Sequence, residues 1–476
     1  MKIAAAPEFL LLAMRSAQTA VSTRFALPIP LGERRSIAIG WLVLGLAALV
    51  GSGLFSILLV LARTPYVQQL VPVADLFHVA LVVHVDLSVL VWFVALAGVL
   101  WTLNGGERWL SLAWIGLTLA FVGTAFICVA PVSGYGAPIM SNYVPVLDNR
   151  TFLYGLSVLG LAFALLAFRA LAAPSRIGVR LDGTGALRFR LNAAAVSGAV
   201  AVLAFAWSWY EIPADLQGKA YYELLFWGGG HVIQFTWTLL MLVAWLWLAT
   251  LSGARLPLTP RMAVLLFGVG LAAVFATPLI YLSWPIIAPE HTRMLTWLMR
   301  FGGGLAILPM GLAVLAGLAR GGSVETSARP LRAALIASMA LFAFGGLIGF
   351  AIKGSDVRIP AHYHGAIVGI TLALMGLVYA LLPRLGFGVP SQRWATLQPT
   401  LYGGGQMLHI VGLVWSGGYG VQRKVAGSAQ VLTSAAEVAG MGLMGLGGLV
   451  AIAGGVLFLV VVIRAMIERP LAAPAA

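Results

Sequence analysis

Hydrophobic residues in this chain form long unbroken runs and do not alternate with polar positions. Most runs reach about 20 residues, the length that an α-helix needs to cross the hydrocarbon core of a bilayer. The pattern predicts an all-α polytopic membrane protein, and the last run is long enough to begin irregularly. We expect about twelve transmembrane helices, near residues 37–62, 79–101, 110–131, 151–172, 193–210, 224–250, 261–284, 294–319, 331–352, 361–383, 398–416 and 430–465.

The composition supports this interpretation. Hydrophobic residues make up 61% of the chain and charged residues only 9%, whereas a soluble domain carries about 25% charged residues. Most of the surface must therefore face lipid. We expect residues 37–466 to form one twelve-helix membrane domain, flanked by an N-terminal segment (1–36) and a C-terminal tail (467–476).

The net charge of +14 would suggest nucleic-acid binding in a soluble protein. Here its distribution matters more. With the N-terminus placed in the cytoplasm, most of the 29 Lys and Arg residues fall in the inner segments, and every inner loop carries at least one. This asymmetry is the positive-inside signal. We therefore expect both termini to be cytoplasmic, membrane lipid to be the surrounding partner, and nucleic acid not to be a ligand.

The chain has a single cysteine, Cys128, inside an apolar run. One cysteine can form no intrachain disulfide and cannot supply a cysteine pair for a copper or iron–sulfur centre. Metal chemistry in this chain must depend on other side chains.

Histidine is the residue that stands out. On the expected topology all seven lie toward the outer side of the membrane. Ionisable side chains within a membrane are costly and usually face an interior cavity, and imidazole suits haem iron and copper. The histidines are His78, His84, His231, His291, His362, His364 and His409.

The sharpest local pattern is Ile359-Pro360-Ala361-His362-Tyr363-His364-Gly365. Residues i and i+2 of a helix are about 200° apart, so the two imidazoles project to nearly opposite faces. Such a pair is a poor chelate for one metal but suits two haems that flank one helix. Pro360 is well placed at a helix start.

Four segments resemble subunit I of the haem-copper oxidases, in the family's order and over most of the chain. IPAHYHGAIVGITLALMGLVYALLP resembles its tenth helix, LVVHVDLSVLVWFVALAG its second, and FWGGGHVIQF its sixth. GGGQMLHIVGL, followed by Gln422-Arg423-Lys424, resembles its eleventh helix and the basic pair beside the haem propionates. The B-type oxidases are the most similar branch.

The resemblance implies a ligand set. His84 and His364 would be the axial ligands of a low-spin haem, His362 the proximal ligand of a high-spin haem, and His231 a ligand of the copper called CuB. His78 lies six residues before His84, about 120° away around a helix, so the two should not share one role. We assign the ligand role to His84 because the sequence after it matches better.

The resemblance also implies a cap over the propionates. His409, Asp356, Arg423 and Lys424 would lie there, where cations and hydrogen-bond donors balance carboxylates. A solvated outer loop is the alternative for Arg423 and Lys424.

Two departures from the family pattern concern the copper site. Oxygen reductases usually have a Tyr four residues after the sixth-helix His, linked to that His, and this chain has Phe235 there. The family also has a His-His pair at the outer end of the seventh helix, where this chain reads Leu279-Ile280-Tyr281-Leu282. His291 could return as a ligand, or Tyr281 could enter the distal pocket as a donor.

A single histidine is a poor copper site, since stable sites have about three protein ligands. The distal metal is therefore copper, iron with carboxylates from Glu223 and Glu290, or absent. No acidic residue lies deep in the inner half of an expected span, whereas pumping oxidases often have one there. Nitric oxide reductases of the same superfamily lack the linked Tyr and take protons from outside.

These observations predict a catalytic subunit of a respiratory oxidoreductase in a bacterial inner membrane. It would reduce O2 or NO, with a slight preference for NO, at a high-spin haem that receives electrons from a low-spin haem. The alternatives are a proton-translocating B-type cytochrome c oxidase and a non-catalytic two-haem protein for electron transfer, sensing or assembly. With no CxxCH motif, the chain would take electrons from a small outer subunit carrying CuA or haem c, or from a soluble cytochrome c.

Overall fold

The computed structural model describes residues 24–67, 74–134, 136–178, 181–352, 354–426 and 429–468. Eleven helical spans of this part are long and apolar enough to cross a membrane. The described long helices are α2 (Glu33–Arg63), α3 (Ala74–Val85), α4 (Trp92–Asn104), α5 (Leu110–Val129), α6 (Arg150–Ala172), α7 (Gly183–Glu211), α8 (Gly218–Leu251), α9 (Pro260–Ala272), α10 (Ala276–Ser283), α11 (Pro289–Trp297), α12 (Gly304–Arg320), α13 (Arg329–Ala351), α14 (Arg358–Leu381), α15 (Gln392–Gly418) and α16 (Ala435–Ile467).

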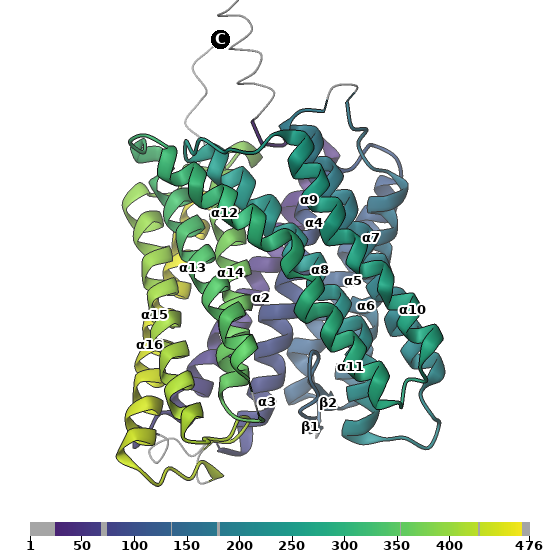
Figure 1. Ribbon diagram of the computed structural model, residues 1–476, viewed down its shortest axis with the longest axis vertical. Helices are drawn as coiled ribbons and strands as arrows, with labels where there is room; N and C mark the ends of the chain where they lie inside the picture. Colours follow the sequence, from purple (N-terminus) through teal and green to yellow (C-terminus); the bar gives the residue numbers. More distant parts are fainter. Residues whose placement is uncertain are drawn as a thin grey trace, which may run out of the picture.

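Helix α15 supplies the twelfth predicted span. It is 27 residues long but less apolar than the others, and it runs along α16 and beside α13 and α14 (Figure 1). A Cβ at Gly405 of α15 would lie 2.8 Å from the Gly447 carbonyl oxygen of α16. Small residues at such contacts let two membrane helices pack closely without a hydrophobic driving force. The predicted all-α polytopic fold is therefore confirmed, with a helix at each of the twelve predicted runs.

Three spans are interrupted. The π-helix η2 (Asp86–Val91) joins α3 to α4 directly after His84, the 3-10 turn η4 (Ala273–Phe275) joins α9 to α10, and the π-helix η5 (Leu298–Gly302) joins α11 to α12. Segments of π-helix inside α-helices occur frequently at functional sites. The last span shows the predicted irregular start, since α16 begins only at Ala435.

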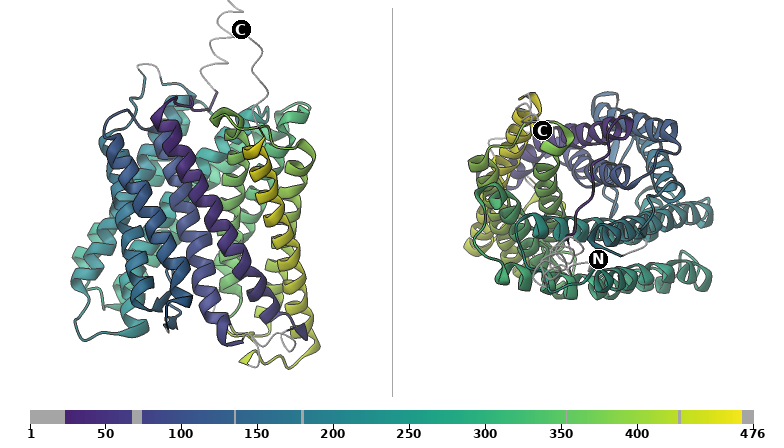
Figure 2. Two further views of the ribbon diagram at one scale, coloured as in Figure 1. Left: turned by 180° about the vertical axis from the view of Figure 1, so that it is seen from behind. Right: turned by 90° about the horizontal axis from the view of Figure 1, so that it is seen from above.

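Helices α8 and α14 occupy the middle of the bundle (Figure 1) and contact one another. They are its most buried spans, with 83% and 78% of their apolar windows inside the protein. Helix α2 starts, and α16 ends, at the same end of the bundle (Figure 2). An even number of membrane crossings, as predicted from the sequence, brings the first and last helix ends to the same side.

A two-stranded hairpin lies at the opposite end of the bundle, near α3 and α11 (Figure 1). Strand β1 (Ala137–Ile139) pairs antiparallel with β2 (Val146–Asp148), so that Pro138 faces Leu147. Val146 and Leu147 are buried. Connecting segments usually run over the surface, so a buried hairpin indicates a specific role for the residues at its tip.

Candidate functional site

His84, in the last turn of α3, is oriented by α2. Its Nδ1 donates a hydrogen bond to the Ser52 carbonyl oxygen (3.0 Å), and the Ser52 hydroxyl lies 3.0 Å from the same nitrogen. Because a carbonyl oxygen can only accept, the proton of the neutral ring is on Nδ1. Nε2 then carries the lone pair and points away from α2.

His364 on α14 and His409 on α15 lie next to each other. Their ring centroids are 4.6 Å apart. His364 Nδ1 is 3.1 Å from the Gln406 side-chain oxygen, and His409 Nδ1 is 2.9 Å from the Met444 carbonyl oxygen. His409 is buried (8% exposed), whereas His364 is only half-buried. The structure thus places His409 beside a predicted haem ligand.

His362 projects from α14 toward α13. Its Nδ1 donates to the Gly345 carbonyl oxygen at 2.7 Å, and a Cβ at Gly349 would lie 2.8 Å from that nitrogen. Helix α13 therefore approaches the imidazole closely. The i, i+2 spacing separates the two ring environments as predicted: His362 contacts α13 and His364 contacts α15.

His84, His362 and His364 share one arrangement. Each is half-buried, each has Nδ1 bonded to an oxygen acceptor, and no hydrogen bond from a described residue reaches Nε2. Metal-ligating histidines almost always donate their other N–H in this way, which fixes the ring and makes the ligating nitrogen more basic. The donor set of these three residues fits two haem groups.

His231 on α8 is different. It is 1% exposed, and both of its ring nitrogens are bonded. Nδ1 donates to the Trp227 carbonyl oxygen at 2.7 Å, so Nε2 is the acceptor, and the Tyr143 hydroxyl donates to it at 2.8 Å. Tyr143 comes from the tip of the β1–β2 hairpin, 88 positions earlier in the chain.

The hairpin is fastened to α8 at this point. Asn142 donates twice to the Glu223 carboxylate, from its backbone N–H (3.1 Å) and from its side chain (3.0 Å). Tyr143 has φ 66°, a backbone region that bulky side chains rarely adopt and that often occurs at functional sites. The carboxylate of Glu223 is therefore engaged by the hairpin, and Glu290 is 44% exposed beside Arg293.

Three glycines before His231 admit aromatic rings to the surface of α8. A Cβ at Gly228 would overlap the Tyr281 hydroxyl, and a Cβ at Gly230 would lie 2.8 Å from Tyr143 Cβ and overlap the ring. Only glycine permits approaches this close. The Trp-Gly-Gly-Gly-His run is thus explained by aromatic packing around His231.

Tyr281 of α10 does not bond to His231. Its hydroxyl lies 2.7 Å from Ser208 Oγ and donates to the Ala204 carbonyl oxygen at 3.1 Å. The His291 ring packs edge-on against it, with 4.7 Å between centroids, and His291 Nε2 is buried without a hydrogen-bond partner among the described residues. These two residues form a separate aromatic contact beside α8.

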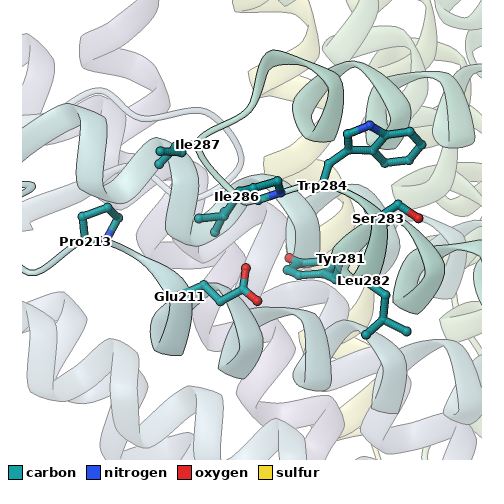
Figure 3. Close-up of a pocket in the computed structure, with 9 residues that line it drawn as sticks. Glu211, Pro213, Tyr281, Leu282, Ser283, Trp284, Ile286 and Ile287 are labelled. Carbon is teal, nitrogen blue, oxygen red and sulfur yellow. The ribbon is translucent and has the colours of Figure 1, made fainter.

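A surface pocket of about 430 Å³ lies over Tyr281 (Figure 3). Its lining includes Glu211 at the end of α7 and the α10–α11 connection from Leu282 to Ile287. The Glu211 carboxylate accepts a hydrogen bond from Trp207 Nε1 at 2.7 Å. Tyr281 therefore lines this pocket on one side and contacts His291 on the other.

The predicted basic pair binds the hairpin. Lys424 Nζ donates to the Met140 carbonyl oxygen at 2.7 Å, and Arg423 lies 3.4 Å from the Asn142 side-chain oxygen. Burial, and secondly the neighbouring Arg423 charge, lower the pKa of Lys424 to about 8. His78 donates from Nε2 to the Lys424 carbonyl oxygen at 2.9 Å, which makes it part of this outer network.

Asp356 completes the outer network. Arg358 Nε donates to its carboxylate at 2.9 Å, and this hydrogen bond is the main cause of the lowered pKa of Asp356. Its backbone forms a bridge with Gln422, which ties the start of α14 to the loop that carries Arg423. Of the predicted propionate-side residues, Asp356, Arg423 and Lys424 therefore belong to one network in which part of their hydrogen-bonding capacity is used within the protein, whereas His409 lies beside His364.

The sequence did not identify Tyr143 or Asn142, nor the two hydrogen bonds from Asn142 to the Glu223 carboxylate. The sequence signal was the glycine run before His231, which indicates a close approach to α8 without identifying what approaches. The strand–turn–strand segment at 137–148 lies between two apolar runs, and it carried no separate prediction.

Comparisons with known proteins agree with the fold. No family model matches the chain. It is 29% identical to the uncharacterized protein RP382 of Rickettsia prowazekii, over 90% of this chain and 95% of that one. It is 28% identical to an uncharacterized protein of Aquifex aeolicus, over 73% and 85% of the two chains.

A solved structure of a heme-copper terminal oxidase dimer superposes with a TM-score of 0.71, covering 93% of this chain and 85% of that chain at 15% sequence identity. The chain therefore has the fold of haem-copper oxidase subunit I, as the four sequence segments predicted. A match at this low identity shows the fold alone, because one fold hosts different chemistries.

Proposed function

We propose that this chain is the haem-binding subunit of a membrane oxidoreductase that reduces a diatomic gas. One observation carries the proposal: His84, His362 and His364 are each held by Nδ1 and keep Nε2 available. Three imidazoles prepared in this way, within a fold shared with a terminal oxidase, suit haem ligation better than a structural role.

His84 and His364 would hold a low-spin haem, and His362 a second haem with an open face. Haem, when bound, supplies one-electron exchange and an iron site for a gas ligand. The protein fixes the ligands: Ser52 orients His84, Gln406 orients His364, and Gly345 orients His362. Because His362 and His364 are two residues apart on α14, that helix provides a short path between the two sites.

We favour NO over O2 as the gas because of where the acidic residues lie. The carboxylates that are buried in the described chain are Asp86 and Asp356, and both are in the first half of their spans or before it, toward the hairpin end. A proton supply from that side is typical of nitric oxide reductases. Phe235, which replaces the family's Tyr, carries less weight, since Tyr143 brings a phenol to His231.

The chain must obtain electrons from elsewhere. It has one cysteine and so no cysteine pair for CuA. We propose that a small subunit carrying CuA or haem c, or a soluble cytochrome c, docks at the hairpin end. The membrane would be a bacterial inner membrane with both termini in the cytoplasm.

The test is haem analysis of the purified protein by pyridine haemochrome, followed by NO- and O2-electrode assays with a reduced donor. We expect two haems per chain, NO consumption faster than O2 consumption, and loss of turnover in His362→Ala with the low-spin spectrum retained. Protein without haem would refute the proposal. Two haems without turnover of either gas would support the non-catalytic alternative.

A further inference from the structure

The resemblance to haem-copper oxidases implies that His231 is a copper ligand. The hydrogen bonds of its ring determine whether it could bind a metal. A metal ligand needs a free lone pair, and a neutral imidazole has one. In His231 that lone pair, on Nε2, accepts the Tyr143 hydroxyl, while Nδ1 is bonded to Trp227. No ring nitrogen remains for a metal.

Additional ligands are also missing. No group of three or more His, Cys, Asp or Glu side chains able to hold a metal occurs in the described residues. Glu223 is bonded to Asn142, and His291, whose Nε2 has no hydrogen-bond partner among the described residues, is a single imidazole packed against Tyr281. A stable copper or iron site has about three protein ligands, so the donor set around His231 does not fit one.

Several features of the chain hold Tyr143 beside His231. Asn142 clamps the hairpin tip to α8, the Tyr143 backbone has positive φ, and Gly230 leaves room for the ring against the helix. The ring also packs 4.7 Å from the His231 ring, centroid to centroid. Four independent features therefore hold the phenol on Nε2.

The Tyr143 hydroxyl remains a donor at neutral pH. Burial, and secondly the neighbouring Tyr363, raise the pKa of Tyr143 well above its ordinary value. Tyr363 lies between His362 and His364 on α14. Arg423 lies 3.4 Å from the Asn142 side-chain oxygen and donates to the Ser355 hydroxyl at 3.3 Å, so the hairpin tip is tied to the segment that leads into α14 and its two predicted haem ligands.

We propose that the distal site of this chain is a metal-free hydrogen-bonding pair, Tyr143–His231, and that the protein retains haem iron as its only metal. The pair would place the Tyr143 O–H dipole, whose hydrogen is donated to His231, beside a small diatomic ligand at the His362 site. This second part rests on the proposed function, whereas the absence of a second metal at His231 does not.

The first experiment measures metals in protein produced with added copper and with added iron. We expect iron equal to the haem content and no stoichiometric copper, with both values unchanged in His231→Ala. Non-haem iron or copper that is present in the wild type and lost in His231→Ala would overturn the inference and leave the proposed function intact. Absence of haem would instead overturn the proposed function. If His231→Ala fails to fold, His231→Gln replaces it, because an amide can bond to both Tyr143 and Trp227.

The second experiment records the C–O stretching band of the carbonmonoxy form by infrared spectroscopy. We expect Tyr143→Phe to shift this band, because the O–H dipole near the bound gas is removed and His231 Nε2 loses its hydrogen-bond donor. The matched control is Tyr379→Phe, which removes another buried hydroxyl, bonded to Gln398, at the far end of α14. An unshifted band in Tyr143→Phe would overturn the placement of the pair beside the gas, and equal shifts in both variants would do the same.

Discussion

Two neighbourhoods of this bundle each carry buried or half-buried histidines but differ in how the imidazoles are bonded. Around α14, the His362 and His364 rings keep Nε2 unbonded by any described residue and are half-buried. Around α8, His231 is buried with both nitrogens bonded. The fold is that of a terminal oxidase in both regions, so one arrangement of helices holds imidazoles with two different hydrogen-bonding patterns.

The difference is local. The imidazoles around α14 are oriented by carbonyl and amide oxygens, which accept from Nδ1, and no described residue bonds to the second nitrogen. Around α8 a carbonyl also accepts from Nδ1, but the hairpin adds a phenol donor on the other side. Tyr143 therefore occupies the ring nitrogen of His231 that no described residue bonds in His362 and His364.

The largest expected effect comes from breaking the α14 neighbourhood. His364→Ala removes a residue that we propose as a low-spin haem ligand, so we expect the haem content to fall from about two to about one per chain and the low-spin spectrum to disappear. His84→Ala should have the same result. The measurement is the pyridine haemochrome together with the reduced-minus-oxidised spectrum.

The control for this prediction is His78→Ala. His78 lies on the same helix as His84 but donates to the Lys424 carbonyl oxygen, so we expect it to leave both haems in place. Loss of the low-spin haem in His78→Ala, with His84→Ala unaffected, would exchange the roles assigned to the two residues.

One added methyl group at position 230 of α8 should displace Tyr143 from His231. In Gly230→Ala the added Cβ would overlap the Tyr143 ring, so the hairpin tip must move away from His231. We expect a loss of about 3 kcal/mol in the free energy of unfolding, the upper range for overpacking, measured by unfolding in mixed detergent. The carbonmonoxy band should shift as in Tyr143→Phe.

Gly404→Ala on α15 is the matched control. A Cβ at Gly404 meets nothing within 4 Å, so alanine should be neutral or stabilise the helix by about 0.5–1 kcal/mol. If both variants unfold equally easily, the close approach of Tyr143 to α8 is not what makes position 230 sensitive.

The sequence was most informative where the signal is local. A run of apolar residues predicts a span by itself, and the i, i+2 spacing of His362 and His364 fixes their divergence on any helix. The position of Tyr143 depends on a contact between a hairpin and a helix 88 positions apart. No periodicity within either segment encodes that distance.

The glycine run before His231 illustrates the same limit. Three glycines in a membrane helix predict a close approach by another group, and the structure shows one. Whether that group is a flat cofactor, a helix backbone or an aromatic ring depends on the neighbouring elements. Similarly, His291 was expected either to reach the distal site or to stay apart, and only the packing against Tyr281 shows where it lies.

A smaller effect is expected from weakening the hydrogen bonds that orient the His84 ring. Ser52→Ala removes the hydroxyl 3.0 Å from His84 Nδ1 and keeps the backbone carbonyl. Loss of a hydrogen bond behind a metal ligand costs 10–100-fold in affinity, and we expect about 10-fold because the carbonyl remains. The measurement is haem transfer to apomyoglobin, and Ser56→Ala, whose hydroxyl bonds only to the Gly53 carbonyl oxygen among the described residues, should not change it.

The smallest expected effect is a pH dependence of the midpoint potential of the proposed haem. Lys424 has a pKa of about 8, so it is a cation at pH 7 and mostly neutral at pH 9. A positive charge near a haem disfavours the oxidised form, so loss of the charge should lower the midpoint potential as the pH rises. The slope should stay below about 59 mV per pH unit, the limit for one proton coupled to one electron. Lys424→Arg keeps its charge over this range, and its potential should therefore change less between pH 7 and 9. Equal slopes in the two proteins would show that another group titrates, and a slope that vanishes in Lys424→Arg would place Lys424 close to the haem propionates.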